Sequence, residues 1–217
     1  LLENFCRKKR SKSLLVAHHQ DDQIETFLIR LSRGSGVEGL SSMQEMTTLK
    51  RGIRLIRPLL EFKKEELINI ASKTFKKIFK DPTNVNRKFL RTNIRALKKN
   101  LVNKGINLEK IVRSIKNIAS TKEAIDFYVE KSIKKFVKFE KRSTILNLKQ
   151  FKKEPQEIKL RIINKIVTNR SNSYYPPRAK KVLNLISGFQ SNNLKKCTLG
   201  GCIFERKKSS LYVSKEF

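Results

Sequence analysis

The sequence predicts an α/β protein: a partial, doubly wound parallel sheet, followed by a mainly helical domain that ends in small β elements. Two short apolar runs, at residues 14–17 and 53–56, are each followed by a segment of helical periodicity, an order typical of parallel strands joined by helices. From about residue 107 helical patterns follow one another, and β-like runs return near residue 197. The 217 residues allow one large domain or two modest ones.

The first strand is predicted from Leu14 to Ala17 and the first helix over residues 22–32. Asp21 and Asp22 stand between them, where an N-cap and first-turn acids favour the start of a helix. The sequence Arg-Gly-Ser-Gly at 33–36 is expected to end this helix.

The next predicted elements are a strand at 53–56, stopped by Pro58, and a helix over 63–75. A turn at 81–84 and a very basic helix at 88–102 complete the first domain, which we expect to span residues 1–105.

The second domain is expected to span residues 106–217. It begins with a long helix that reaches about residue 140, and two further helices start at Pro155 and at Pro176-Pro177. Short β runs are predicted at the end of the chain. They lie at residues 197–199, 202–206 and 211–213.

The charge is strongly positive: 50 Lys and Arg oppose 19 Asp and Glu, a net charge of +31. Residues 1–50 carry only +2 and residues 51–217 carry +29, a difference that a uniform codon bias does not explain. A polyanionic partner is therefore expected, with RNA and DNA not distinguished by charge. Three cysteines make no disulfide framework, which favours a reduced, cytoplasmic compartment, and no membrane-spanning run or membrane partner is expected.

Functional groups concentrate where the first strand meets the first helix, at His18, His19, Asp21, Asp22 and Glu25. In open α/β sheets, ligands bind at the carboxyl ends of strands, close to helix N-termini. Adjacent carboxylates there hold Mg²⁺, act as a general base or bind an ammonium group. Zinc is less favoured, because the His pair lacks the spacing of a helical zinc site and no cysteine pair accompanies it.

Two basic features follow. The residues Arg33, Gly34, Ser35 and Gly36 are suited to approach a phosphate, although they also make an ordinary helix stop. The residues Arg87, Arg91 and Arg95 recur every fourth position, which lines them on one helical face as a phosphate-binding strip or a solvated surface.

Taken in order, these motifs resemble the tRNA(Ile)-lysidine synthetase family of PP-loop ATPases. The resemblance rests on His-His-x-Asp-Asp-Gln-x-Glu-Thr at 18–26, Arg-Gly-Ser-Gly at 33–36, Arg-Pro-Leu-Leu at 57–60, Asp-x-Thr-Asn at 81–84 and the Arg-containing run at 89–95. It extends more weakly to Pro176-Pro177-Arg178 and the closing β runs. It implies an adenine nucleotide α-hydrolase-like fold for residues 1–105 and a tRNA-recognition role for residues 106–217.

The resemblance also implies a reaction. Such enzymes use ATP and Mg²⁺ to adenylate the wobble cytidine of a CAU-anticodon tRNA(Ile), and free L-lysine then displaces AMP to give lysidine. By the same resemblance Asp22 is the essential carboxylate and Asp21 the second, and either could hold Mg²⁺. His18 and His19 lie near the reacting groups, and Glu25 binds the lysine cation.

The remaining positions follow in the same way. Residues 33–36 border the nucleotide or base pocket, whereas Arg87, Arg91 and Arg95 contact phosphates. The family also leads us to expect a cytoplasmic or organellar protein, with a homodimer as one oligomeric form.

One family motif is absent from the sequence: no Ser-Gly-Gly-x-Asp-Ser loop is present. We therefore expect that this loop and two strands precede Leu1, and that the chain by itself is inactive. Two alternatives stay open. One is a PP-loop enzyme of the 2-thiocytidine type, which the Cys-x4-Cys spacing at 197–202 disfavours, and the other is a non-catalytic basic RNA-binding protein.

Overall fold

The computed structural model describes residues 2–49, 52–75, 90–171, 173, 175–191 and 194–216. The chain forms two compact units, Leu1–Lys122 and Glu123–Phe217, which we call the N-terminal and C-terminal units. The division falls inside α6 (Leu108–Phe136), the long helix that the sequence predicted. The domain boundary near residue 105 precedes this helix and stays a prediction.

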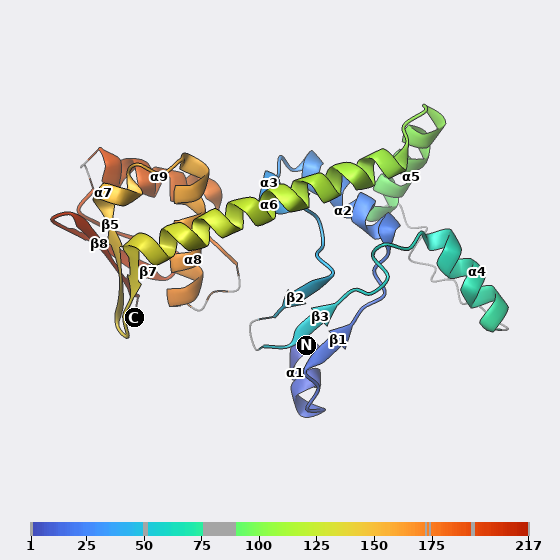
Figure 1. Cartoon of the computed structure of the whole chain (residues 1–217), viewed down its shortest axis with the longest axis horizontal. Helices are drawn as coiled ribbons and strands as arrows, with labels where there is room; N and C mark the ends of the chain where they lie inside the picture. The colour runs from blue at the N-terminus through green and yellow to red at the C-terminus, as the bar shows by residue number, and fades with distance from the viewer. Residues whose placement is uncertain are drawn as a thin grey trace. The chain divides into compact units, whose positions relative to one another are not determined.

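The N-terminal unit contains a three-stranded sheet with helices connected to it (Figure 1). Its described elements before α6 are α1 (Leu2–Lys8), β1 (Ser13–Leu15), α2 (Gln20–Ser32), α3 (Val37–Leu40), β2 (Met46–Thr48), β3 (Arg54–Ile56), α4 (Lys64–Thr74) and α5 (Leu90–Asn103). The strands and helices predicted at 14–17, 22–32, 53–56, 63–75 and 88–102 are confirmed at β1, α2, β3, α4 and, from Leu90 onward, α5.

The sheet of this unit is mixed. Strand β1 runs parallel to β3, as predicted, with Leu14 opposite Leu55. Strand β2 runs antiparallel to β3, and the sequence did not predict it. All three residues of β2 are exposed, so the strand lacks the alternation of buried and exposed side chains that marks a strand in a sequence. Strand β2 forms because its backbone pairs with that of β3.

Helices α2 and α5 pack together and position the functional side chains. Each buries an isoleucine, Ile24 on α2 and Ile94 on α5. Helix α4 differs, since it buries none of its residues and projects away from the sheet in Figure 1. The support for the site therefore comes mainly from α2, α5 and the strand ends.

The C-terminal unit holds a five-stranded antiparallel sheet in the order β4-β5-β8-β7-β6. Helices α8 and α9 pack together, and α8 contacts strands β5, β7 and β8 (Figure 1). The elements after α6 are β4 (Val137–Phe139), β5 (Ser143–Asn147), α7 (Leu148–Phe151), α8 (Gln156–Ser171), α9 (Ala179–Gln190), β6 (Lys196–Leu199), β7 (Cys202–Lys207) and β8 (Ser210–Lys215). A continuous apolar core joins the sheet and helices, with Ile162, Phe204 and Val213 fully buried.

The predicted helices after Pro155 and Pro176-Pro177 are confirmed as α8 and α9, and the three β runs as β6, β7 and β8. The structure adds the hairpin β4–β5, whose first strand occupies residues assigned by sequence to the long helix. Val137 pairs with Leu146 and both are buried, so sheet pairing decides the conformation there. Within the described part of the chain, no helix is long and apolar enough to cross a membrane.

Candidate active site

The candidate site lies at the start of α2, beside the carboxyl ends of β1 and β3. After β1, the Val16 N–H donates to the Ile56 carbonyl at 3.0 Å, which keeps the two strand ends together. The Gln20 N–H then donates to the Phe62 carbonyl, also at 3.0 Å, and ties the first turn of α2 to the segment after β3. The predicted location at a strand end and a helix N-terminus is the one observed.

Asp22 is held in the first turn of α2 by the residue that caps the helix. Its Oδ2 accepts a hydrogen bond from the His19 backbone N–H at 3.1 Å and lies 3.4 Å from His19 Nε2. The carboxylate is 8% exposed. A negative charge at this position also interacts favourably with the N-terminal end of the helix dipole. Asp22 is therefore a buried, oriented carboxylate with His19 as its immediate neighbour.

His18 and His19 each bury a ring nitrogen. In both residues Nδ1 is buried and makes no hydrogen bond within the described structure. Burial lowers the pKa of the His18 imidazole, although the nearby Asp22 carboxylate acts in the opposite direction. Because the ordinary pKa is 6.5, His18 is mostly neutral at pH 7 and offers a lone pair.

Glu25 lies one turn beyond Asp22 and is 2% exposed. Its Oε1 accepts a hydrogen bond from Arg95 Nε at 2.8 Å, which links α2 to α5. Its Oε2 is buried and makes no hydrogen bond within the described structure. Arg95 therefore occupies one oxygen of Glu25, the carboxylate that the family resemblance assigns to the lysine cation. The second oxygen of Glu25 stays available as a hydrogen-bond acceptor.

Asp21 points to a different set of partners. Oδ1 pairs with Lys98 Nζ of α5, and Oδ2 accepts a hydrogen bond from the Lys64 backbone N–H at 3.1 Å. Burial raises the pKa of Asp21, but the bonds from Lys98 and Lys64 outweigh it and hold the pKa below its usual value. Asp21 thus joins α2, α4 and α5, a structural role in addition to any chemical one.

A cavity of about 590 Å³ opens beside Asp21. Its wall combines aliphatic side chains with carboxylates and ammonium groups, so it suits a small molecule that is apolar in part and charged at its ends. Its lining comprises Gln20, Asp21, Ile24, Lys63, Lys64, Glu65, Ile68, Val102, Gly105, Ile106, Asn107, Leu108 and Glu109. Lys63 and Glu109 form an exposed ion pair at 2.7 Å on this wall.

The Arg-Gly-Ser-Gly segment ends α2, as predicted. The N–H groups of Arg33, Gly34 and Ser35 all donate to carbonyls of the last turn of α2, at 2.9 to 3.2 Å. Gly34 has φ +68°, the left-handed conformation common at helix ends. These N–H groups are satisfied by the helix, so they form no cradle for a phosphate, and a role at the border of the base pocket would fall to the side chains and to Gly36.

The arginine strip divides into two environments. Arg91 and Arg95 both lie on α5, but Arg95 binds the buried Glu25 whereas Arg91 is exposed. The predicted phosphate contact of Arg95 stays a prediction, and Arg87 lies outside the described residues.

Three further residues contribute to the site. Lys98 is the ion-pair partner of Asp21 and lies one turn after Arg95, a spacing that could have indicated it. The Gln23 carboxamide donates to the Met43 carbonyl at 2.7 Å and accepts from the Met43 N–H at 2.8 Å, so it fixes the 41–44 segment to α2. Arg57 donates to the Gln44 carbonyl at 2.8 Å and holds the same segment from β3. No local sequence signal could have shown these last two contacts.

Within the described residues, no group of three or more His, Cys, Asp and Glu side chains is arranged to hold a metal ion. Both Asp21 oxygens already accept bonds from nitrogen atoms, which leaves Asp22 as the better-placed carboxylate for a cation. A magnesium ion here would need most of its ligands from substrate phosphates and water, as is common for this ion.

Comparison with known proteins identifies the first part of the chain. The model of the PP-loop domain family matches residues 1–101. The tRNA(Ile)-lysidine synthase of Wolbachia sp. subsp. Brugia malayi is 34% identical over 218 residues, covering 100% of this chain and 50% of the relative. The synthase of Rickettsia typhi is 34% identical over 223 residues with the same coverages, and that of Ruegeria pomeroyi is 29% identical over 203 residues, covering 94% and 48%.

The chain thus spans about half the length of the curated relatives that it matches. The matched PP-loop region contains the functional side chains of α2 and α5, whereas the cavity wall from Val102 to Glu109 follows it. The alignment with the relatives continues through the C-terminal unit. Residues 1–101 therefore match the PP-loop domain family, and along its whole length the chain is similar to about half of a tRNA(Ile)-lysidine synthase.

Proposed function

We propose that this chain supplies the lysine-handling and RNA-binding parts of an enzyme that forms lysidine at the wobble cytidine of a CAU-anticodon tRNA(Ile). The observation that carries the proposal is the pair of buried carboxylates on α2, Asp22 and Glu25, at the strand ends of a PP-loop domain. Relatives named tRNA(Ile)-lysidine synthase align over the whole chain and support this reading.

Lysine must lose a proton from its ε-ammonium group before it can attack a carbon centre. Asp22 is the base that we assign to this proton, because it is buried, oriented by the His19 backbone N–H and close to the neutral His18. The free Oε2 of Glu25 is the acceptor that we assign to the lysine cation. Burial strengthens this attraction, since little water screens it.

The cavity beside Asp21 is the proposed entry for the lysine molecule. Its aliphatic residues Ile24, Ile68 and Val102 suit the butyl chain, and its charged residues suit the two ends of an amino acid. The lowered pKa of Asp21 keeps this carboxylate negative at physiological pH.

ATP and Mg²⁺ are the proposed cosubstrates of the complete reaction. The described residues do not fit a triphosphate, because the N–H groups at 33–35 bond to α2 and both oxygens of Asp21 are engaged. We therefore assign no activation step to these residues. A cytoplasmic location and a homodimer, which the resemblance leads us to expect, are the remaining parts of the proposal.

The test uses a chimera in which this chain replaces the matching half of the Wolbachia synthase. We expect it to incorporate labelled lysine into a CAU-anticodon tRNA(Ile) transcript only when ATP is present. Incorporation without ATP would refute the proposed reaction. A folded chimera that binds the tRNA but incorporates no lysine would favour the non-catalytic RNA-binding alternative.

A further inference from the structure

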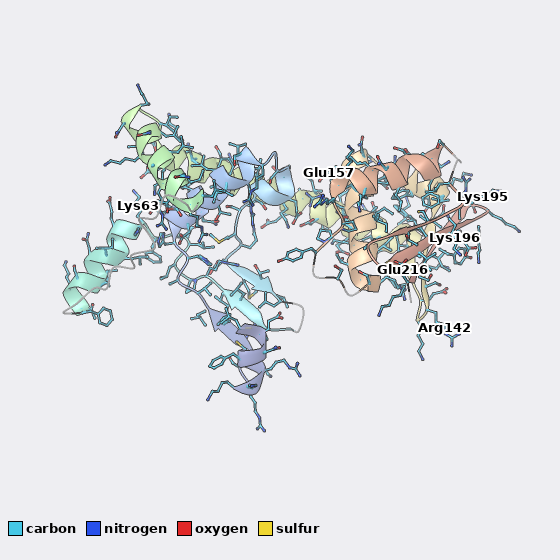
Figure 2. The ribbon with its side chains drawn as sticks, turned by 180° about the vertical axis from the view of Figure 1, so that it is seen from behind. Lys63, Arg142, Glu157, Lys195, Lys196 and Glu216 are labelled. Carbon is cyan, nitrogen blue, oxygen red and sulfur yellow. The ribbon has the colours of Figure 1, made fainter. Side chains whose placement is uncertain are left out.

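The hairpin β4–β5 (residues 137–147) carries exposed positive charge at its tip. Lys138, Lys141 and Arg142 are exposed, and within the described structure no carboxylate pairs with any of the three. Figure 2 shows Arg142 at the end of the hairpin, directed away from the body of the C-terminal unit. The acid at the tip, Glu140, accepts a hydrogen bond from the Ser143 hydroxyl at 3.4 Å. We propose that this basic hairpin is a docking surface for the sugar-phosphate backbone of RNA.

The conformation of the tip is held by Arg170 of α8. Its guanidinium donates to the carbonyls of Glu140 at 2.8 Å, Lys141 at 3.2 Å and Ser143 at 2.5 Å. It also donates to the Thr144 hydroxyl, at 2.7 Å from Nη2. The planar guanidinium of an arginine has five donors in a fixed geometry, whereas a lysine ammonium has three donors on one nitrogen atom. A turn that would otherwise be flexible is thereby presented in one conformation.

The partners of Arg170 are neutral oxygens, so its charge adds to that of the tip. Three other acids of the unit are engaged elsewhere: Asp126 and Glu157 pair with Arg161, and Glu130 pairs with Lys165. The unit as a whole carries 22 Lys and Arg against eight Asp and Glu. Together with Arg170, the hairpin therefore carries four cations, Lys138, Lys141, Arg142 and Arg170, against the single carboxylate of Glu140.

An RNA strand fits this surface better than a lipid membrane does. Phe139 follows Lys138 in the hairpin and is 47% exposed, and an exposed aromatic side chain next to a basic turn suits the stacking of a base. An amphipathic membrane-binding helix presents a broad apolar face opposite its charges, whereas the exposed large apolar side chain of this hairpin is Phe139. The inference rests on the proposed function in one respect, namely that the RNA is a tRNA.

The experiment measures the affinity of the full 217-residue chain for a labelled CAU-anticodon tRNA(Ile) transcript over a series of salt concentrations. The tip variant is Lys141→Ala with Arg142→Ala. The matched control is Lys195→Ala with Lys196→Ala, which removes two adjacent exposed cations at β6, the opposite edge of the same sheet (Figure 2). We expect the tip variant to lose affinity about tenfold and to reduce the salt slope by about one for each cation, because each phosphate contact releases counterions.

The control should change affinity less than about threefold. Equal losses of RNA affinity in the two variants would overturn the proposal. The positive charge of the whole unit would then attract RNA, and the hairpin would have no special role. Unchanged RNA affinity in the tip variant, together with a loss of binding to anionic phosphatidylserine vesicles, would overturn it in favour of a membrane. These measurements concern binding alone. The hairpin proposal can therefore fail while the chimera incorporates lysine, and it can hold while the chimera incorporates none.

A second variant tests the positioning role of Arg170. Arg170→Lys keeps the charge and loses most of the hydrogen bonds to the turn. We expect a reduced RNA affinity with an unchanged salt slope, at a thermal midpoint close to that of the unmodified chain. An unchanged affinity would show that the turn needs no such support, and the positioning role would be lost.

Discussion

The two units differ in the size of their apolar cores and in the charged groups that they bury. The C-terminal unit buries a continuous set of aliphatic and aromatic side chains between its sheet and helices. The N-terminal unit buries Asp22 and Glu25, while Leu15 on β1 and Met46 on β2 are more than half exposed. A buried carboxylate is costly unless it has partners, so the N-terminal unit, which has the smaller apolar core, depends more on ion pairs such as that of Glu25 with Arg95. The C-terminal unit also buries a paired charge, Arg161, but its larger apolar core makes packing the main contribution there. The proposed chemistry lies in the unit that buries carboxylates, and the proposed RNA surface lies on the unit with the larger apolar core.

The largest expected effect comes from Asp22, one of the two buried carboxylates of the N-terminal unit. In the chimera, Asp22→Asn should lower the rate of lysine incorporation by about 10² to 10⁴, because the amide cannot accept the proton. The tRNA affinity should stay within about twofold. Single-turnover incorporation and filter binding measure the two quantities, and retained activity would remove Asp22 from the proposed base role.

The next effect concerns the apolar core of the C-terminal unit. Phe204 is fully buried on β7, and Phe204→Ala should lower the free energy of unfolding by about 3–5 kcal/mol. Leu15→Ala on β1 is the matched change in the other unit, and it should cost less than about 0.5 kcal/mol because Leu15 is 65% exposed. Urea titration with hydrogen exchange locates the loss, and equal costs would contradict the contrast between the units.

A third change tests the dependence on ion pairs. Arg95→Met leaves Glu25 buried without its cation and should cost about 1–3 kcal/mol. Arg91→Met removes the same charge from the exposed position one turn earlier on α5, so its cost should be within about 0.5 kcal/mol. If the two variants unfold at the same urea concentration, the Glu25–Arg95 pair does not support the unit.

The smallest expected effect is a pH dependence. Because burial depresses the pKa of His18, the unfolded chain binds this proton more readily than the folded one. The contribution of neutral His18 to stability should therefore be present above pH 6.5 and decline as the pH falls toward the folded pKa. The chain has two histidines, so NMR titration can resolve both, and a His18 midpoint above 6.5 would contradict the burial argument.

Much of the order of elements could be predicted from sequence, because it depends on local patterns. The acids after the first apolar run indicated the start of α2, and the apolar spacing indicated α4, α6, α8 and α9. Strands β2 and β4 escaped prediction for a physical reason: β2 has no buried face, and β4 continues a helical pattern until Val137 pairs with Leu146. Pairing partners determine such strands, and single-segment periodicity does not record them.

In the candidate site, too, local sequence determined some features and tertiary packing determined others. The sequence by itself determined that His18, His19, Asp21, Asp22 and Glu25 gather at one strand-to-helix junction, because they are neighbours in the chain. It also determined the contrast between a nearly neutral first 50 residues and a basic remainder.

Only the tertiary structure decided which charges meet. Glu25 pairs with Arg95 across 70 positions and Asp21 with Lys98 across 77, because α5 packs against α2. The same packing placed Arg95, predicted as a phosphate ligand, on a buried carboxylate. Arg170 likewise reaches the turn at 140–144 only because α8 lies against the sheet. Long-range partners depend on how elements pack, and a local sequence pattern contains no information about that packing.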